Sequence, residues 1–236
     1  MKTQTCQLIL ALDLEDKSKA FNLLDQLENS LTWVKVGLQM FTQYGPQLLD
    51  EIAAKNYKIF LDLKLHDIPN TVASAIKSLS SSPVEMMTLH ASGGTEMIAA
   101  AKQARDDSPS KAKLIAVTIL TSFNTELLAQ VGITTPIPKQ VARLGSLSIN
   151  SGADGLVCSP HEISTLRENL GENPLLITPG IRPKGSDTGD QKRIMTPSEA
   201  AELGSSFIVV GRPILKAENP QQAAIDIQNQ LSSPTE

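Results

Sequence analysis

Charged side chains of both signs are concentrated in one short stretch of the chain, Asp62-Leu63-Lys64-Leu65-His66-Asp67, directly after an apolar run. Side chains alternate along a strand, so Asp62 and Lys64 are expected on one side, with Asp67 in the turn that follows. Lys35, within Val34-Lys35-Val36-Gly37, repeats this arrangement one apolar run earlier. Charges gathered at strand ends cost desolvation free energy unless they are paired or used in function. The cluster therefore indicates either a structural ion-pair network or a catalytic site that combines carboxylates with ammonium groups.

Two glycine-arginine segments in the last third of the chain have the composition of a phosphate site. They are Pro179-Gly180-Ile181-Arg182 and Gly211-Arg212-Pro213-Ile214. Glycine lets a ligand approach the backbone closely, a following helix N-terminus presents free N–H groups, and arginine offers a bidentate fork to phosphate oxygens. The alternative is two turns with surface arginines. The polar, glycine-bearing loop 184–195 lies between them, and we expect it to act as a lid whose Gln191 reaches the phosphate.

Other polar residues also follow apolar runs. Asp13 follows the first run, and Thr121 and Ser122 follow the fifth. His90 ends the fourth run and is a candidate for the floor of a pocket. Two further histidines favour structural interpretations: His66 falls on the alternate face from Lys64, and His161 falls at an exposed helix start.

The composition excludes several classes of function. The 236 residues are 41% hydrophobic and 19% charged, which is typical of one globular domain spanning residues 1–236. A net charge of -4 and an aromatic content of 3% argue against nucleic-acid binding. No apolar run is long enough for a signal peptide or a membrane span, so we expect a cytoplasmic protein. Cys6 and Cys158 lack metal-type spacing and are expected to be buried, reduced thiols.

Eight short apolar runs recur at fairly even intervals along the chain. They are mostly continuous rather than alternating, which is typical of parallel strands that are covered on both faces. We expect strands at residues 6–12, 32–36, 57–61, 84–89, 114–120, 155–158, 175–178 and 207–210.

Helical periodicity lies between these runs. Apolar residues repeat at three and four positions over residues 20–31, more loosely after Pro138, and again at the end, where Asn219 is placed to cap a helix that starts at Pro220. Eight strands alternating with helices predict an α/β fold, a (β/α)8 TIM barrel of the ribulose-phosphate-binding type. An open doubly wound sheet is the alternative, but the glycine fingerprint expected after its first strand is replaced by Asp13-Leu14-Glu15-Asp16. In a barrel, the candidate site residues that follow these strands meet at the C-terminal ends of the strands.

The same residues carry a resemblance to a known family. The chain closely resembles the bacterial orotidine 5'-phosphate decarboxylases in order and over nearly its whole length. The matching segments are Ala11-Leu12-Asp13, Lys35-Val36-Gly37, the stretch from Asp62 through His66-Asp67-Ile68-Pro69-Asn70-Thr71, Leu120-Thr121-Ser122, Thr178 to Pro183, Asp190-Gln191 and Gly211-Arg212. A wider group of phosphosugar barrels shares the Asp-x-Lys-x-x-Asp core, whereas Lys35 and the His-Asp-Ile-Pro-Asn-Thr continuation are more specific.

The resemblance implies decarboxylation of orotidine 5'-monophosphate to UMP and CO2, the last step of pyrimidine synthesis, without metal, flavin or pyridoxal. It implies that Lys64 donates a proton to C6 and that Lys35, Asp62 and Asp67 complete the charged array, Asp67 coming from the second subunit of a homodimer. The resemblance also implies that Asp13 and Lys35 contact the ribose, together with Thr71 from across the interface. It implies pyrimidine contacts for Thr121 and Ser122. The phosphate contacts that it implies are Arg182, Gln191, Gly211 and Arg212.

Two alternative functions stay open from the sequence. A hexulose-phosphate synthase or keto-gulonate-phosphate decarboxylase would share the core motif but use Mg²⁺, and a cation such as Lys35 repels that ion. A catalytically inactive nucleotide-binding barrel would keep Arg182 and Arg212 and could lose the lysines. Sensitivity to a chelator separates the first alternative, and any turnover excludes the second.

Overall fold

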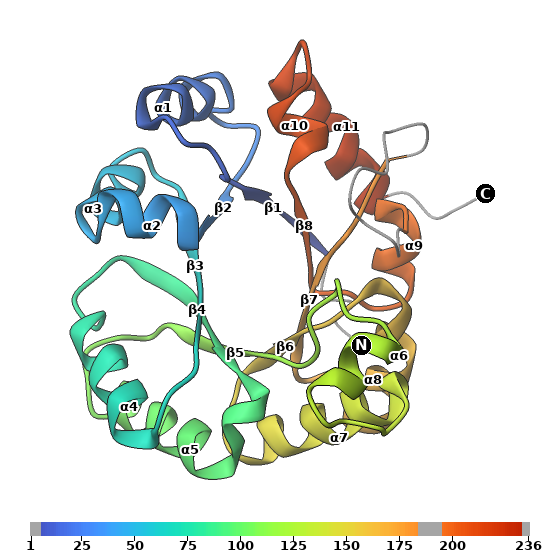
Figure 1. Ribbon diagram of the computed structural model, residues 1–236. Helices are drawn as coiled ribbons and strands as arrows, with labels where there is room; N and C mark the ends of the chain where they lie inside the picture. The colour runs from blue at the N-terminus through green and yellow to red at the C-terminus, as the bar shows by residue number, and fades with distance from the viewer. Residues whose placement is uncertain (1–5, 184–194, 233–236) are drawn as a thin grey trace.

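Eight parallel strands close into a barrel in the computed structural model, which describes residues 6–183 and 195–232 (Figure 1). Each strand pairs with the next along the chain, and β8 returns to pair with β1. This confirms the predicted (β/α)8 architecture. The strands are β1 (Gln7–Ala11), β2 (Trp33–Gly37), β3 (Lys58–Leu65), β4 (Val84–His90), β5 (Lys113–Val117), β6 (Gly155–Val157), β7 (Leu175–Pro179) and β8 (Phe207–Val210).

Helices surround the barrel as an outer ring (Figure 1). Side chains cap several of the helices at their N-termini: for example, Asp16 accepts the N–H of Lys19 at 3.1 Å, and Asn219 accepts that of Gln222 at 3.0 Å, as predicted for the last helix. The helices are α1 (Lys17–Gln26), α2 (Leu38–Tyr44), α3 (Gln47–Ala53), α4 (Pro69–Ser78), α5 (Gly94–Asp106), α6 (Thr125–Gln130), α7 (Ile137–Asn150), α8 (Ile163–Leu170), α9 (Pro197–Glu202), α10 (Arg212–Leu215) and α11 (Pro220–Ser232), with short 3-10 turns at Ala91–Gly93 and Pro160–Glu162.

Both faces of the strands are buried, which explains why the apolar runs are continuous. In β1, Leu8 and Leu10 pack outward against the helices, while Ile9 and Ala11 point into the barrel. The interior is filled by a separate cluster of side chains from most of the strands, comprising Ile9, Ala11, Trp33, Phe60, Met86, Ile115, Ile177, Phe207 and Val209. The barrel is therefore a packed core below the mouth rather than an open channel.

Two strands differ from the predicted bounds by more than one residue at their C-terminal end. β5 ends at Val117, three residues before the end of the apolar run, and Leu120 belongs to the loop that follows. β3 runs on to Leu65, past the end of its apolar run, because its charged end still pairs with β4. The extension contains an irregularity in register: Leu61 pairs with Met87 and Leu65 with Leu89. Apolar composition therefore marks where a strand is covered, not where its ladder of hydrogen bonds stops.

The two cysteines are free thiols, with Cys158 buried and Cys6 partly buried. Burial raises the pKa of each to about 12, so both remain protonated at neutral pH. Within residues 6–183 and 195–232, no helix combines the length and apolar character needed to cross a bilayer.

Candidate functional site

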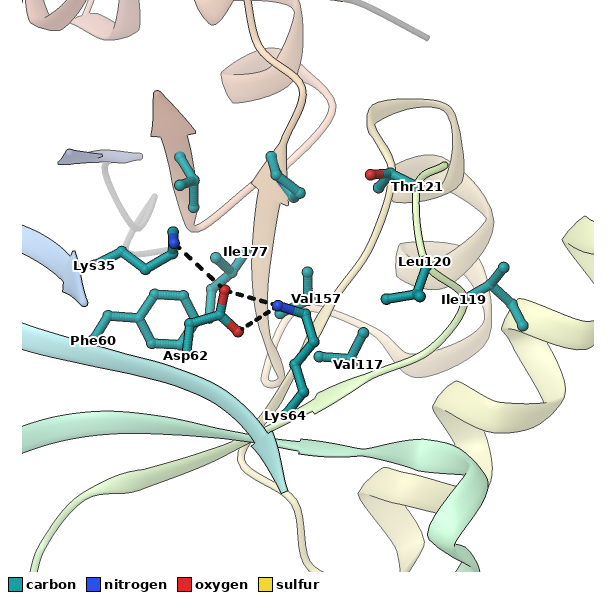
Figure 2. A pocket seen from close by; sticks show the side chains of 12 residues that line it. Lys35, Phe60, Asp62, Lys64, Val117, Ile119, Leu120, Thr121, Val157 and Ile177 are labelled. Atoms are coloured by element: carbon teal, nitrogen blue, oxygen red, sulfur yellow. Dashed lines mark hydrogen bonds and ion pairs between the residues drawn. The ribbon is translucent and has the colours of Figure 1, made fainter. Parts of the chain in front are cut away.

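A row of alternating charges crosses the mouth of the barrel from β1 to β3. Lys35 Nζ lies 3.0 Å from Asp13 Oδ1. Figure 2 shows the rest of the row: Lys35 Nζ lies 3.7 Å from Asp62 Oδ2, and Lys64 Nζ lies 2.9 Å from Asp62 Oδ1. The side chains of Lys35 and Asp62 are only 11% and 13% exposed, so each charge is stabilised by the opposite charges on either side of it in the row. The structure thus brings together four of the sequence-predicted charges, in the order minus, plus, minus, plus.

Lys64 reaches this row from an unusual backbone. Its φ is +51°, in the left-handed region that side chains other than glycine enter at a cost of about 1–2 kcal/mol. The residue lies in the irregular part of the β3–β4 ladder, between Leu61 and Leu65. Its ammonium nevertheless meets both oxygens of Asp62, at 2.9 and 3.0 Å. Asp62 and Lys64 therefore meet as expected from their spacing, although the backbone between them is not a regular strand.

An apolar pocket of about 170 Å³ opens beside Lys64. Lys35, Asp62 and Lys64 line its charged side, and Thr121 lies at its far side (Figure 2). The rest of the wall is apolar and comes from β3 and from the strands or loops of β5 to β8: Phe60, Val117, Ile119, Leu120, Val157, Ile177, Pro179 and Val209. A charge placed here interacts with little competition from water, which strengthens its effect on a bound ring.

A second cavity, of about 400 Å³, adjoins this pocket and shares Lys35, Pro179 and Val209 with it. Arg182 and Arg212 line it together with Gly180, Gly211 and Asp13. Gly180 has a φ of +82°, so the turn after β7 requires glycine, whereas Gly211 has an ordinary φ of -114°. Arg182 is buried, and its backbone is held in place by a hydrogen bond from its N–H to the carbonyl of Met195, at 3.0 Å. The predicted phosphate residues after β7 and β8 thus share one cavity.

Other predicted site residues lie away from these cavities in the single chain. Asp67 is exposed; its carboxylate accepts the N–H of Ile68 at 2.7 Å, and within the described part of the chain it forms no ion pair. Thr71 is exposed in the first turn of α4, and Ser122 is exposed beyond Thr121. Gln191 and nearly all of the expected lid fall outside the described residues.

Two features of the site were not predicted from the sequence. Thr88 in β4 is 1% exposed and contacts both Asp62 and Lys64. The sequence signal that could have revealed it is a polar residue within an apolar run.

The second feature is a pair of histidines. The rings of His66 and His90 stack with centroids 5.2 Å apart, and Nδ1 of His90 lies 2.6 Å from the hydroxyl of Ser92. Burial lowers the pKa of His90, and the neighbouring His66 and Lys64 lower it further. His90, a candidate for the floor of a pocket, is not among the residues that line the pocket described above.

The chemistry available at this site is stabilisation of negative charge. An ammonium held beside an apolar pocket can attract a developing carbanion and then protonate it. The carboxylates alternate with ammonium groups, and among residues 6–183 and 195–232 no group of three or more His, Cys, Asp and Glu side chains is arranged to hold a metal ion.

Comparison with known proteins shows which family has this sequence and this barrel. A model of the Orotidine 5'-phosphate decarboxylase / HUMPS family matches residues 6–227. The orotidine 5'-phosphate decarboxylase of Shewanella sediminis is 47% identical over 231 residues, which cover 96% of this chain and 97% of that protein. That of Opitutus terrae is 46% identical over 228 residues, covering 97% and 99%. The crystal structure of orotidine 5'-phosphate decarboxylase from Lactobacillus acidophilus has a TM-score of 0.87 at 38% identity, covering 97% of this chain and 100% of that one. Matched from its first strand to its last helix, the chain belongs to the Orotidine 5'-phosphate decarboxylase / HUMPS family.

Proposed function

We propose that this protein converts orotidine 5'-monophosphate to UMP and CO2, the last step of pyrimidine synthesis, in the cytoplasm and with its own side chains in place of a metal or organic cofactor. The observation that carries the proposal is the alternating row Asp13, Lys35, Asp62 and Lys64, which lies between an apolar pocket and an arginine-lined cavity. A nucleotide has the matching order of a flat ring, a sugar and a phosphate.

In this assignment the substrate lies across the two cavities. The pyrimidine occupies the apolar pocket with Thr121 at its edge, and Ser122 joins it when the loop after β5 adjusts. The ribose hydroxyls contact Asp13 and Lys35, which line the cavity between ring and phosphate. The phosphate binds Arg182, Gly211 and Arg212, with Gln191 as a further contact. Because the phosphate lies far from the reacting carbon, its binding energy is available for closure of the site.

The chemical step needs the pyrimidine ring of the substrate and one proton. The bond between C6 and the carboxylate breaks, CO2 leaves, and the electron pair stays on C6. Lys64 stabilises this carbanion-like carbon and transfers an ammonium proton to it, after which solvent reprotonates the amine. Asp62 holds the ammonium in place and, lying beside the substrate carboxylate, repels it more before CO2 leaves than after. We take stabilisation by Lys64 as the larger contribution.

A homodimer completes the site in this proposal. Asp67 and Thr71 are exposed in the single chain and are assigned to the active site of the partner. Two large apolar residues at this end of the barrel support an interface: Ile68, next to Asp67 in the chain, is 67% exposed, and Leu38, directly after the strand that pairs with β3, is 54% exposed. Exposed apolar side chains next to a site are typical of a surface that another chain covers.

The experiment that tests the reaction is the ultraviolet absorbance of orotidine 5'-monophosphate over time, with purified protein and excess EDTA. Loss of the substrate absorbance with formation of UMP is the expected result. Activity that requires added Mg²⁺ would instead favour a metal-dependent phosphosugar enzyme. An absence of turnover with and without Mg²⁺ would contradict the proposal and leave a barrel that binds another phosphorylated ligand.

A further inference from the structure

One buried hydroxyl connects the two residues that the proposed reaction uses most directly. The side chain of Thr88 accepts the backbone N–H of Lys64 at 2.8 Å and donates its own proton to Asp62 Oδ1 at 3.0 Å. A carboxylate can only accept and a backbone N–H can only donate, so the direction of both hydrogen bonds is fixed. Thr88 is 1% exposed and is not among the residues lining the pocket, so it acts through these two neighbours.

The position of Thr88 in the sheet explains why a hydroxyl is needed there. Leu61 pairs with Met87 and Leu65 with Leu89, so Thr88 stands opposite the irregular stretch of β3 that contains Asp62 and Lys64. An irregular ladder leaves backbone groups without their usual partner, and a buried N–H without one costs about 1–3 kcal/mol. The Thr88 hydroxyl supplies that partner to Lys64, whose φ of +51° is itself unfavourable.

We propose that Thr88 is a positioning residue for the decarboxylation: its hydroxyl holds the backbone of Lys64 and the carboxylate of Asp62 so that the ammonium points into the pocket. This inference rests on the proposed function. Without the hydroxyl, Lys64 can relax toward an ordinary strand conformation, which moves its ammonium away from C6. A misplacement of about 1 Å in a catalytic group costs on the order of a hundredfold in rate.

The test compares Thr88→Val, which removes the hydroxyl at nearly constant shape, with Thr88→Ser, which keeps it. We expect kcat to fall about tenfold to a hundredfold in Thr88→Val and to stay within about threefold of wild type in Thr88→Ser. The KM and the Kd for UMP should change by less than about threefold in both variants, because the phosphate cavity is untouched. Thr118→Val is the matched control: Thr118 is equally buried, but its hydroxyl donates to the carbonyl of Val157, at 3.2 Å, and the structure shows no hydrogen bond from it to Asp62 or Lys64, so we expect wild-type kcat.

Each outcome decides the role of Thr88. Wild-type kcat in Thr88→Val, or an equal loss in Thr88→Ser, would overturn the proposal, the second because it would assign the effect to the methyl group. If Thr88→Val does not fold, the pair Thr88→Ala and Thr88→Ser isolates the hydroxyl in the same way. Inactive wild-type protein would reject the proposed function itself, whereas active wild-type protein with an unaffected Thr88→Val would reject only this inference.

Discussion

Asp62 is the residue on which both lysines of the site depend. Its carboxylate contacts the ammonium of Lys64 through both oxygens and lies 3.7 Å from that of Lys35. Removing either partner of a largely buried charge pair leaves the other charge uncompensated, which is more costly than the net value of the pair. The row of charges therefore acts as a unit, and single substitutions within it should not have additive effects.

Lys64→Ala is expected to abolish turnover while UMP binding is largely retained. The substitution removes the proton donor and the cation next to C6, a combination for which we expect a loss of about a hundredfold or more in kcat. The arginine-lined cavity to which we assign the phosphate is unchanged, so the Kd for UMP, measured by calorimetry, should change much less. Lys19→Ala, on the exposed surface of α1, is the matched control. More than about a tenth of wild-type turnover in Lys64→Ala would rule out the proton-donor role.

His90 should make the protein less stable in mildly acidic solution. Burial, and then His66 and Lys64, lower its pKa in the folded protein below the ordinary value of 6.5. The unfolded chain therefore takes up a proton as the pH falls through about 6.5 while folded His90 stays neutral, so the free energy of unfolding decreases until the folded pKa is reached.

Urea unfolding at several pH values between about 5 and 8 measures this effect. His90→Gln should flatten the decrease, and His161→Gln, at an exposed position, should not. Identical pH profiles for wild type and His90→Gln would show that His90 does not carry the effect.

At the level of strands and helices, the sequence is a good guide to which segments form strands and a poorer guide to how those strands pair in detail. All eight strands lie at the predicted places, because buried parallel strands require continuous apolar runs. The extension of β3 through charged residues was not predictable in this way, since Asp62 and Lys64 are held by Thr88 and by each other rather than by apolar burial. Likewise, the left-handed backbone of Lys64 has no signal in its residue type, because lysine does not favour that conformation.

The pairing of β6 with β7 depends on the absence of a side chain at Gly155. A Cβ at this position would lie 2.4 Å from the carbonyl oxygen of Leu175, its partner in the ladder. Gly155→Ala must therefore push the two backbones apart, and we expect a loss of about 1–3 kcal/mol in the free energy of unfolding, measured in urea. Gly145→Ala in α7 is the matched control, because its Cβ would meet only the side chains of Leu166, Leu156 and Leu170. Equal stability of the two variants would contradict this account.

At the scale of the whole molecule, a single chain brings together only some of the residues expected in the active site. Four charges of the array converge, while Asp67 and Thr71 point to the exposed side that carries Ile68. Sequence spacing could place all of them on one strand and the turn after it, but spacing does not reveal which chain's pocket a turn residue enters. That assignment rests on the family resemblance and is open to a direct test.

Mixing two inactive variants tests whether the sites are shared. Lys64→Ala and Asp67→Asn should each be inactive alone. If Asp67 acts across the interface, a heterodimer of the two has one site with an intact Lys64 and an intact Asp67. An equimolar mixture, after subunit exchange, should therefore recover about a quarter of wild-type kcat. No recovery, with exchange verified by native mass spectrometry, would place Asp67 in the site of its own chain or outside the site.

The pairing of β8 with β1 has a consequence for how the protein is made. The ribosome releases β1 before the other strands of the barrel and β8 after them, yet the two are neighbours in the closed barrel. Until residues 207–210 emerge, β1 has a free edge of unpaired N–H and C=O groups, and such edges recruit other strands. The nascent chain therefore carries an aggregation-prone edge throughout the synthesis of the strands between β1 and β8.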